Sequence, residues 1–383
     1  AHAGAVSGPT AQALLDRVRG LRRARDLSMA GITRDLGRAV EYCDRSVVMR
    51  AGEVVEANRT DALFADPQHP YTRALIRATP RRGAALRSLL PEDDPRRNEA
   101  ATQPIGGPRP APLLTVDGLT KAFDAPGAGL NFFGRGDTAP PVRAVDDIGF
   151  EIGAGESVGL VGESGCGKST TSLMLMRLMD PTAGRIQFED TDIAQIPAKR
   201  FPRHPLRQKL QMVFQDPTDS LNPRFTARQC IADPVLRLGV ERGGRAVQDR
   251  VSALADLVSF PRALLDRFPH QLSGGQKARV GIARAIALNP SFLVLDEPTA
   301  ALDVSVQAVV LNLLADLRAQ LGLSYLFVSH DLTVVRLLCD RVMVMRAGKL
   351  IETGTAEAVM SAPKDPYTAA LLAASPAPPA AFA

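Results

Sequence analysis

The sequence predicts an α/β fold, and three observations point to it. An apolar run, Ser157–Gly162, leads directly into a glycine-rich stretch and then into a segment with helical character. A second apolar run, Ser291–Pro298, ends in two adjacent carboxylates. The third feature is an internal repeat, because Leu27–Pro80 returns as Leu323–Pro376. Short apolar runs of this kind are typical of strands buried in a parallel sheet, whose strands alternate with helices.

The composition of the chain is that of a globular protein. Of its 383 residues, 45% are hydrophobic and 23% are charged. The net charge of +5, from 46 basic and 41 acidic residues, indicates an arginine-rich solvated surface and predicts no nucleic-acid partner. The sequence contains no run of 18 apolar residues, so it predicts no membrane-spanning helix. The first ten residues lack the features of a signal peptide.

The cysteines form no metal-binding or disulfide pattern. None of them lies in a C-x-x-C spacing, which favours a reducing, cytosolic compartment. The four are Cys43, Cys166, Cys230 and Cys339. The chain begins with Ala, so we expect a fragment or a processed product.

The internal repeat predicts two copies of one domain. Leu27–Pro80 aligns with Leu323–Pro376 without gaps, at a constant offset of 296 and with 22 identities in 54 positions. Upstream, Gln12 pairs with Gln307 after a one-residue gap. We therefore expect residues 1–80 to be the C-terminal remnant of a first domain. Residues 81–111, rich in Arg, Pro, Gly, Asp and Glu, are predicted to form a flexible linker.

The second copy begins with two alternating segments. Leu113–Phe123 and Ala144–Ile152 alternate apolar and polar residues, as half-buried strands do. A stretch dense in glycine and proline, Asp124–Pro141, separates them and predicts a loop.

The glycine-rich stretch GESGCGKST, Gly162–Thr170, fits the phosphate-binding pattern G-x-x-x-x-G-K-[ST]. Its glycines allow a tight turn that brings backbone N–H groups against phosphate oxygens. Lys168 supplies a positive charge, Ser169 supplies a hydroxyl for Mg²⁺, and the start of the following helix adds its dipole. The motif requires a strand before it and a helix after it, and both are predicted, so we expect a nucleotide triphosphate site.

The carboxylates at the end of SFLVLDEP complement this site. Asp296 stands at the strand end, where it can hold the shell of a Mg²⁺ ion. Glu297 comes one residue later, on the other side of the pleat, where it can polarise an attacking water. An acidic turn is common after a strand, but together with the phosphate loop it predicts nucleotide hydrolysis.

A second helix start that favours an anion lies more than 100 residues further along the chain. In LSGGQKAR, Leu272–Arg279, two glycines precede the apolar helical segment VGIARAIAL. The exposed backbone N–H groups and the helix dipole favour an anion. Since one nucleotide has a single triphosphate, we expect this second site to close over the nucleotide of another copy in a composite dimer.

With these motifs in this order, residues 112–360 resemble the ATP-binding cassette (ABC) ATPases. GESGCGKST resembles Walker A, LSGGQ the signature loop and LVLDEP Walker B. FQDP places Gln215 in the Q-loop, and VSHD places His330 as the switch histidine. AALD resembles the D-loop, with Ala300 where serine is commoner. The resemblance implies a P-loop NTPase fold with a RecA-like core, an antiparallel β subdomain and a helical signature subdomain, preceded by the remnant of a second ABC domain.

The resemblance also implies a role for each matched residue. Lys168 would bind phosphate, Glu297 would activate water, His330 would contact the γ-phosphate, and Gln215 would sense it and touch the membrane partner. An aromatic at position 123 would stack on adenine, with a core aromatic as the alternative. The positions expected to contact ATP are Phe123, Gly162, Glu163, Ser164, Gly165, Cys166, Gly167, Lys168, Ser169, Thr170, Gln215, Ser273, Gly274, Gly275, Gln276 and Asp303. Those expected to hold Mg²⁺ are Ser169, Gln215 and Asp296.

Two features are typical of the peptide-importer branch. QDPTDSLNPRFTARQCI contains the S-L-N-P-R of that branch, and DPYTAALLAASP resembles the C-terminal extension of oligopeptide and dipeptide importers, here residues 361–383. HPYTRALIRATP repeats this extension in the first copy. Dipeptide, oligopeptide and nickel systems share these marks, so the cargo stays open. Some members carry an iron–sulfur motif in this tail, but no cysteine follows Cys339, so none is expected.

The resemblance therefore implies an ATPase that energises import, peripheral on the cytoplasmic face of the inner membrane. Its expected partners are two transmembrane permease subunits, a substrate-binding protein and a second ABC ATPase domain. Two alternatives stay open: a non-transport ABC ATPase that acts on ribosomes or DNA, and a truncated, uncoupled ATPase. The first copy has Arg34 where the second has His330, so we expect its site to be degenerate.

Overall fold

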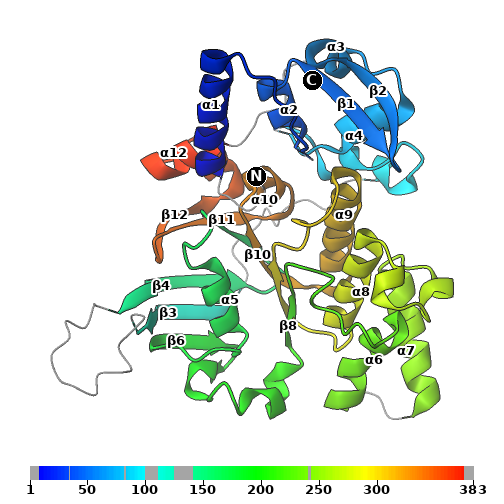
Figure 1. Cartoon of the computed structure of the whole chain (residues 1–383). Coiled ribbons are helices and arrows are strands. Elements are labelled where there is room, and N and C mark those ends of the chain that lie inside the picture. The colour runs from blue at the N-terminus through cyan, green and yellow to red at the C-terminus, as the bar shows by residue number, and fades with distance from the viewer. Residues whose placement is uncertain are drawn as a thin grey trace, which may run out of the picture.

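The computed structural model describes residues 8–33, 35–81, 83–99, 111–124, 141–239 and 243–374. A six-stranded sheet lies at its centre, with strand order β12-β11-β5-β10-β9-β8 (Figure 1). All neighbouring strands are parallel except β11 and β12. The strands are β5 (Ser157–Val161), β8 (Leu210–Val213), β9 (Phe292–Asp296), β10 (Ser324–Ser329), β11 (Arg341–Arg346) and β12 (Lys349–Thr355). Every residue of β5, β8, β9 and β10 is buried, which explains their continuous apolar sequences.

Both faces of this sheet are covered. In β10, Tyr325 and Phe327 pack among residues of α6, α8, α9 and α10, whereas Leu326 and Val328 pack among residues of α5 and a second sheet. The helices of this part are α5 (Lys168–Leu175), α6 (Ala227–Leu238), α7 (Gly244–Leu257), α8 (Gly274–Ile286), α9 (Val304–Leu321), α10 (Leu332–Leu338), α11 (Ala356–Ser361) and α12 (Pro366–Ala373). Single 3₁₀ turns are η4 (Ile193–Gln195), η5 (Phe201–Arg203), η6 (Pro205–Arg207), η7 (Arg262–Leu264) and η8 (Pro269–Gln271).

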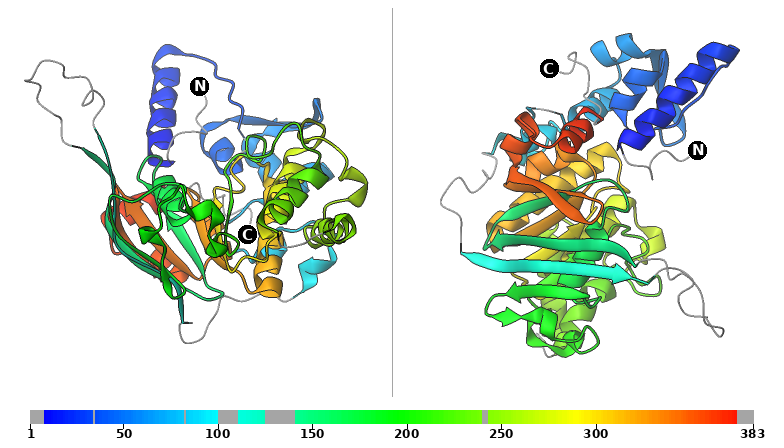
Figure 2. Two further views of the ribbon diagram at one scale, coloured as in Figure 1. Left: turned by 90° about the horizontal axis from the view of Figure 1, so that it is seen from below. Right: turned by 90° about the vertical axis from the view of Figure 1, so that its left-hand side faces the viewer.

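The second sheet is antiparallel, with strand order β4-β3-β6-β7. Its strands are β3 (Pro112–Phe123), β4 (Val142–Gly153), β6 (Ala183–Phe188) and β7 (Thr191–Asp192). It lies on one side of the central sheet, and α6, α7 and α8 lie on the other (Figures 1 and 2). The predicted fold, with a mostly parallel core, an antiparallel β subdomain and a helical subdomain, is confirmed.

The repeat in the sequence is also a repeat in the structure. The first copy has α1 (Gly8–Arg25), α2 (Leu36–Tyr42), β1 (Arg45–Arg50), β2 (Glu53–Arg59), α3 (Thr60–Ala65) and α4 (Pro70–Ala78). From α2 to α4, each element starts 296 residues before its counterpart among α10, β11, β12, α11 and α12. The irregularity in the β1–β2 register at Val48/Met49 recurs in β11–β12 at Val344/Met345. A small core of its own holds this unit together: Leu36, Ala39, Val48, Leu63 and Phe64.

One part of the repeat differs between the copies. Residues 28–33 form no strand, although their counterpart Ser324–Ser329 is the buried strand β10. β10 lies between β5 and β9, and the described part of the first copy contains no counterpart of either. In β1, Val47 and Met49 are 58% and 57% exposed, whereas Met343 and Met345 of β11 are fully buried. The first copy therefore carries an unpaired strand edge and an uncovered apolar face.

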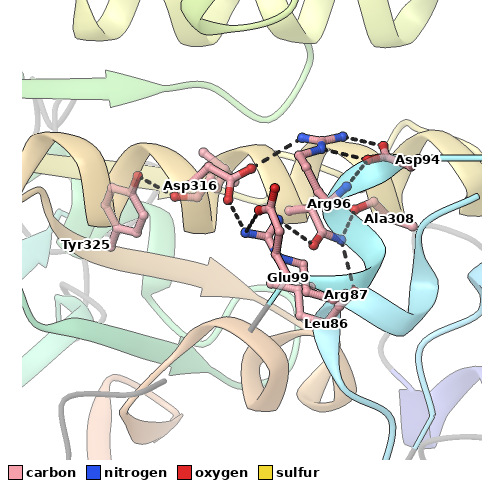
Figure 3. Close-up of polar contacts among 10 residues, drawn as sticks. Leu86, Arg87, Asp94, Arg96, Glu99, Ala308, Asp316 and Tyr325 are labelled. Carbon is pink, nitrogen blue, oxygen red and sulfur yellow. Dashed lines mark hydrogen bonds and ion pairs between the residues drawn. The ribbon is translucent and has the colours of Figure 1, made fainter. Parts of the chain in front are cut away.

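Part of the segment predicted to be a flexible linker, Leu86–Glu99, is instead packed against α9. We call this part the strap. It contains η2 (Leu86–Leu89) and η3 (Pro95–Asn98). Arg87 donates a hydrogen bond to Asp316 of α9, and Arg96 reaches the other oxygen of the same carboxylate at 3.3 Å (Figure 3). The Asn312 side-chain amide, also on α9, donates to the Leu86 carbonyl at 3.0 Å.

The sequence did not predict the packing of the strap for two reasons: its apolar residues have no regular spacing, and two of its arginines bind residues far away in the sequence. The strap buries three leucines, Leu86, Leu89 and Leu90. Arginine and proline residues surround them, so the sequence shows no apolar spacing typical of a helix or a strand. Arg87 and Arg96 of the strap find partners on α9, more than 200 residues away in the sequence. Residues 100–110 of the predicted linker lie outside the described residues.

Removing the carboxylate under the strap is expected to destabilise the protein. Asp316→Ala would leave the buried Arg87 guanidinium without its main partner, at a cost of about 2–4 kcal/mol in the free energy of unfolding. Denaturant unfolding of the full chain measures this change. Asp256→Ala is the matched control, since it breaks an exposed pair with Arg262 and should leave the free energy of unfolding nearly unchanged. An equal loss in the free energy of unfolding for the two variants would show that the Arg87–Asp316 pair stabilises the protein no more than an exposed pair does.

Among the described helices, α9 is long and apolar enough to cross a membrane, with a mean hydropathy of 1.2. Its packing argues for a different role. Ala308, Val310, Leu311 and Leu314 are buried in the core, and the strap and α4 contact the same helix. We interpret α9 as a core helix.

Candidate active site

The predicted site residues meet at one edge of the central sheet. β8, β9, β10 and β5 are parallel neighbours, so their carboxyl ends lie side by side. Gln215 follows β8, Glu297 follows β9, His330 follows β10 and the phosphate-binding loop follows β5. The topology thus brings together residues that are up to 168 positions apart (Gly162 to His330).

The phosphate-binding loop has glycine where no other residue fits. A Cβ atom on Gly162 would lie 2.2 Å from the Met345 carbonyl oxygen. One on Gly167 would lie 2.3 Å from the Ala144 carbonyl oxygen, and Gly167 also has a φ of +113°. The tight loop then passes into α5 at Lys168. These constraints explain the spacing of the motif.

Lys168 is buried and its ammonium group points into this loop. It donates to the carbonyl oxygens of Gly162 and Glu163, each at 2.8 Å, and lies 3.8 Å from the sulfur of Cys166. Ser164, Gly165 and Ser169 are exposed around it. A positive charge surrounded by an open loop at a helix N-terminus suits an anionic phosphate chain.

Asp296 has an environment that suits a divalent cation. Its carboxylate is buried, and burial followed by the adjacent Glu297 charge raises its pKa to about 6, against a hydrogen bond from Ser169 and the Lys168 charge. The Oδ1 atom is buried and has no hydrogen-bond partner among the described residues. An unpaired carboxylate oxygen beside a hydroxyl is the hard oxygen donor set that Mg²⁺ prefers. The described residues contain no cluster of three His, Cys, Asp or Glu side chains for a metal, so hydroxyl, amide or ligand oxygens would complete the shell.

Glu297 is the centre of the polar cluster. Its Oε2 atom accepts a hydrogen bond from the Gln215 amide at 3.1 Å and lies 3.2 Å from Nδ1 of His330. Its backbone has a φ of 45° and its N–H donates to the Val328 carbonyl at 2.9 Å, so the side chain is held by the sheet. A strained φ at such a position requires support from the surrounding structure.

The charges in this cluster favour an ionised carboxylate. Burial alone would raise the pKa of Glu297, but the hydrogen bond and charge of His330 and the Lys168 charge lower it below its ordinary value. The pKa of His330 is raised, mainly by its hydrogen bond to Glu297. The site can therefore present a carboxylate to a water, beside an imidazole whose protonated form this contact favours.

The signature loop is placed on the helical side of the molecule. Ser273 and Gln276 cap each other at the start of α8, through Gln276 N–H to Ser273 Oγ at 3.3 Å and Ser273 N–H to Gln276 Oε1 at 2.9 Å. Gly275 packs against Val306 of α9 so closely that a Cβ atom would lie 2.5 Å from it. Within the described residues, no hydrogen bond joins Ser273–Gln276 to the phosphate-binding loop. Asp303 caps the start of α9, accepting from the Val306 N–H at 2.9 Å.

Phe123 ends β3 and does not belong to the core. Its ring is 40% exposed, and the Lys121 ammonium lies 5.3 Å from the ring centroid. An exposed ring at a strand end suits stacking on a nucleobase. The alternative reading of Phe123 as a core aromatic is wrong.

Phe123→Ala is expected to weaken ATP binding by about 1–2 kcal/mol, roughly five- to thirtyfold, through the loss of stacking. Mg-tripolyphosphate has no base, so its affinity should not change. Titration of both ligands into the purified variant measures the difference. A parallel loss for the two ligands would place Phe123 outside the base site.

Two residues of this region escaped the sequence analysis. Asp331 accepts from the N–H groups of Thr333 and Val334 and caps α10, which fixes the turn that carries His330. Tyr367 of α12 accepts a hydrogen bond from the Glu163 N–H at 3.0 Å. The repeated tyrosine of HPYT and DPYT was the available signal for the second. Arg34, predicted at the switch position of the first copy, lies outside the described residues.

Comparisons with known proteins agree with this arrangement. Residues 145–300 match the ABC transporter family, and residues 55–107 and 351–381 match the oligopeptide/dipeptide transporter C-terminal region. The chain is 39% identical over 370 residues to the glutathione import ATP-binding protein GsiA of Pectobacterium atrosepticum, and 38% identical to that of Salmonella typhi. Both matches cover 95% of this chain and 58% of the relative, so the chain spans less than two thirds of their length.

Solved structures give the same fold. A dimeric post-hydrolysis state of the ATP-binding cassette MJ0796 with ADP and Pi is 27% identical, with a TM-score of 0.54. It covers 63% of this chain and 98% of that one. The cbiO1 protein of Clostridium perfringens, part of the transporter complex cbiONQ, is 29% identical with a TM-score of 0.55, over 66% of this chain and 91% of that one.

Proposed function

This chain belongs to the ABC transporter ATPases, and we propose that it hydrolyses Mg-ATP to energise the import of short peptides across the cytoplasmic membrane. The observation that carries the proposal is the Glu297 carboxylate. Its pKa is lowered, and Gln215 and His330 contact it. It follows β9, which β10 separates in the sheet from β5, the strand that leads into the phosphate-binding loop.

The proposed mechanism assigns one task to each side chain. Lys168 exchanges the carbonyls of Gly162 and Glu163 for phosphate oxygens when ATP binds. Glu297 accepts a hydrogen bond from the attacking water and orients it towards the γ-phosphate. His330 places positive charge beside the γ-phosphate, where negative charge develops.

Mg²⁺ would be held by Ser169, Asp296 and Gln215, and when bound it neutralises charge on the β- and γ-phosphates. The orphaned oxygen of Asp296 and its raised pKa support this assignment. Gln215 is exposed beside Glu297, so it can face both the cation and a neighbouring subunit.

We propose that the active form has two such domains, with the signature loop of one closing over the nucleotide of the other. Ser273 and Gly274 are exposed at the start of α8, where backbone N–H groups and the helix dipole favour an anion. Asp303 would lie at the same contact. The absence of a hydrogen bond between the described signature loop and the phosphate-binding loop of the same chain agrees with a site that is completed from outside.

The first copy supports the same proposal. We propose that residues 1–80 are the C-terminal end of a second ABC domain. The uncovered Val47 and Met49 correspond to positions that β11 buries against the second sheet and α5, so the same packing would cover them in a complete copy. We also propose that this first site is degenerate, on the basis of the Arg34/His330 difference in the sequence.

The proposed partners are two permease subunits and a substrate-binding protein, which place the ATPase on the cytoplasmic face of the membrane. A hollow of about 280 Å³ between α6 and α7 is lined by Phe225, Arg228, Ala232, Leu236 and Val251. Leu236 is 61% exposed there. An apolar hollow on the helical subdomain suits a short helix from a permease loop.

The test is an affinity purification from native membranes with the tagged Glu297→Gln chain and Mg-ATP, read by mass spectrometry. Recovery of two multi-spanning permease subunits supports the importer, and uptake assays with dipeptides, oligopeptides, glutathione and nickel then identify the cargo. Recovery of ribosomes or DNA-repair proteins would move the assignment to the non-transport class. Recovery of chaperones alone would support an uncoupled ATPase.

A further inference from the structure

The C-terminal extension touches the phosphate-binding loop directly. Tyr367, the second residue of α12, is 9% exposed, and its hydroxyl accepts a hydrogen bond from the Glu163 backbone N–H at 3.0 Å. The guanidinium of Arg346 lies 4.8 Å from the centroid of its ring. The contact joins positions 204 residues apart in the sequence. Nothing in the catalytic roles assigned above uses this tyrosine.

The extension is held in place by a buried carboxylate. Glu352 of β12 accepts hydrogen bonds from the backbone N–H groups of Lys364 and Asp365, at 2.8 and 3.1 Å. Asp365 in turn caps α12 by accepting from the Tyr367 N–H at 2.7 Å. Burial would raise the pKa of Glu352, but these backbone hydrogen bonds lower it. The sheet therefore fixes the start of α12, and α12 fixes the direction of the tyrosine.

The first copy repeats this arrangement, and within the described residues no phosphate-binding loop lies against it. Glu56 accepts from the N–H groups of Gln68 and His69 at the same 2.8 and 3.1 Å, and Arg50 lies 5.1 Å from the ring centroid of Tyr71. Among the described residues, the Tyr71 hydroxyl has no hydrogen-bond partner. The chain thus supplies two tyrosines in matched surroundings, of which one contacts a phosphate-binding loop.

The tyrosine acts on the peptide group that links Gly162 to Glu163. Its N–H, that of Glu163, donates to Tyr367, and its carbonyl, that of Gly162, accepts from the Lys168 ammonium at 2.8 Å. Lys168 must leave that carbonyl to reach a phosphate, so the carbonyl needs another support for the loop to keep its shape. A hydrogen bond on the N–H side supplies it without occupying the anion site. The Glu163 N–H would otherwise be left partly buried and unpaired.

We propose that Tyr367 is a positioning residue that holds the peptide group between Gly162 and Glu163, so that the phosphate-binding loop stays arranged for ATP. This inference rests on the proposed ATPase function. It also assigns a task to the C-terminal extension, which acts on nucleotide binding through α12.

The experiment compares Tyr367→Phe with Tyr71→Phe in the full chain. Each change removes one hydroxyl and leaves the ring against its arginine. Tyr367→Phe is expected to raise the Kd for Mg-ATP and the KM about three- to tenfold, with kcat at saturating ATP within about twofold of the parent. Tyr71→Phe is expected to change neither. Glu352→Gln, which disturbs the start of α12 from outside the loop, should raise the Kd in the same direction.

The outcomes separate this inference from the function on which it rests. A parent chain that binds no ATP contradicts the proposed function itself. A parent chain that binds ATP, with equal Kd values for both phenylalanine variants, overturns the role of Tyr367. A lower melting temperature for Tyr367→Phe with an unchanged Kd also overturns it, because the hydroxyl would then serve stability alone.

Discussion

Replacing Glu297 with glutamine is expected to lower ATP turnover about 10²- to 10⁴-fold while leaving ATP binding intact. The amide keeps the size and shape of the side chain and can still contact Gln215 and His330, so the loop that binds phosphate is not disturbed. It cannot accept a proton or orient a water as a carboxylate does. Steady-state phosphate release and an equilibrium ATP titration on the same preparation measure the two effects.

The matched control for this change is Glu357→Gln. Glu357 pairs with Arg336 on the surface and its side chain is exposed, so turnover should stay within about twofold of the parent. Preserved hydrolysis in Glu297→Gln would remove Glu297 from the role of general base. Loss of ATP binding in the same variant would mean that the carboxylate organises the site instead of acting on water.

The second large effect is expected for Lys168→Ala. Removal of the ammonium takes away a charge-assisted contact with the phosphates, worth about 1.5–3 kcal/mol, so the Kd for Mg-ATP should rise roughly 10- to 150-fold. The hydrogen bonds of Lys168 in this structure go to two carbonyls and one sulfur of the same loop, so the largest effect is expected on binding. Titration of Mg-ATP into the variant measures the Kd, and circular dichroism checks the fold.

Lys349→Ala serves as the control, since Lys349 is exposed and pairs only with Asp146 among the described contacts. Its Kd should match that of the parent. An unchanged Kd in Lys168→Ala would contradict the placement of the triphosphate in this loop. A loss that appears equally in both variants would reflect net charge, which salt would then abolish.

The sequence predicted which candidate residues lie together where local geometry is demanding. The loop before Lys168 needs glycine at two crowded positions, so its spacing can be recognised without any neighbour. Asp296, Glu297 and His330 follow apolar strands, and parallel strands place such residues at one edge. The order of the motifs was therefore enough to predict which side chains meet.

Contacts between distant segments could not be predicted in this way. No pattern in the sequence links Tyr367 to Glu163, because they lie on separate elements. Their contact depends on where Glu352 anchors α12. The strap failed as a prediction for the same reason, since Arg87 finds Asp316 only in three dimensions. Residues 28–33 show the opposite case: they stand at the position of β10 in the repeat but form no strand, and the described part of the first copy contains no counterpart of the neighbouring β5 and β9.

The carboxylates that hold the extension, Glu56 and Glu352, also bear on how the two copies arose. Glu56 and Glu352 bind the following turn with the same pair of distances, and each copy sets an arginine against the tyrosine that follows. If each copy had acquired the extension independently, the same carboxylate, turn, helix start and tyrosine would have had to arise twice with the same spacing along the chain. The common ancestor of the two copies therefore already carried the extension.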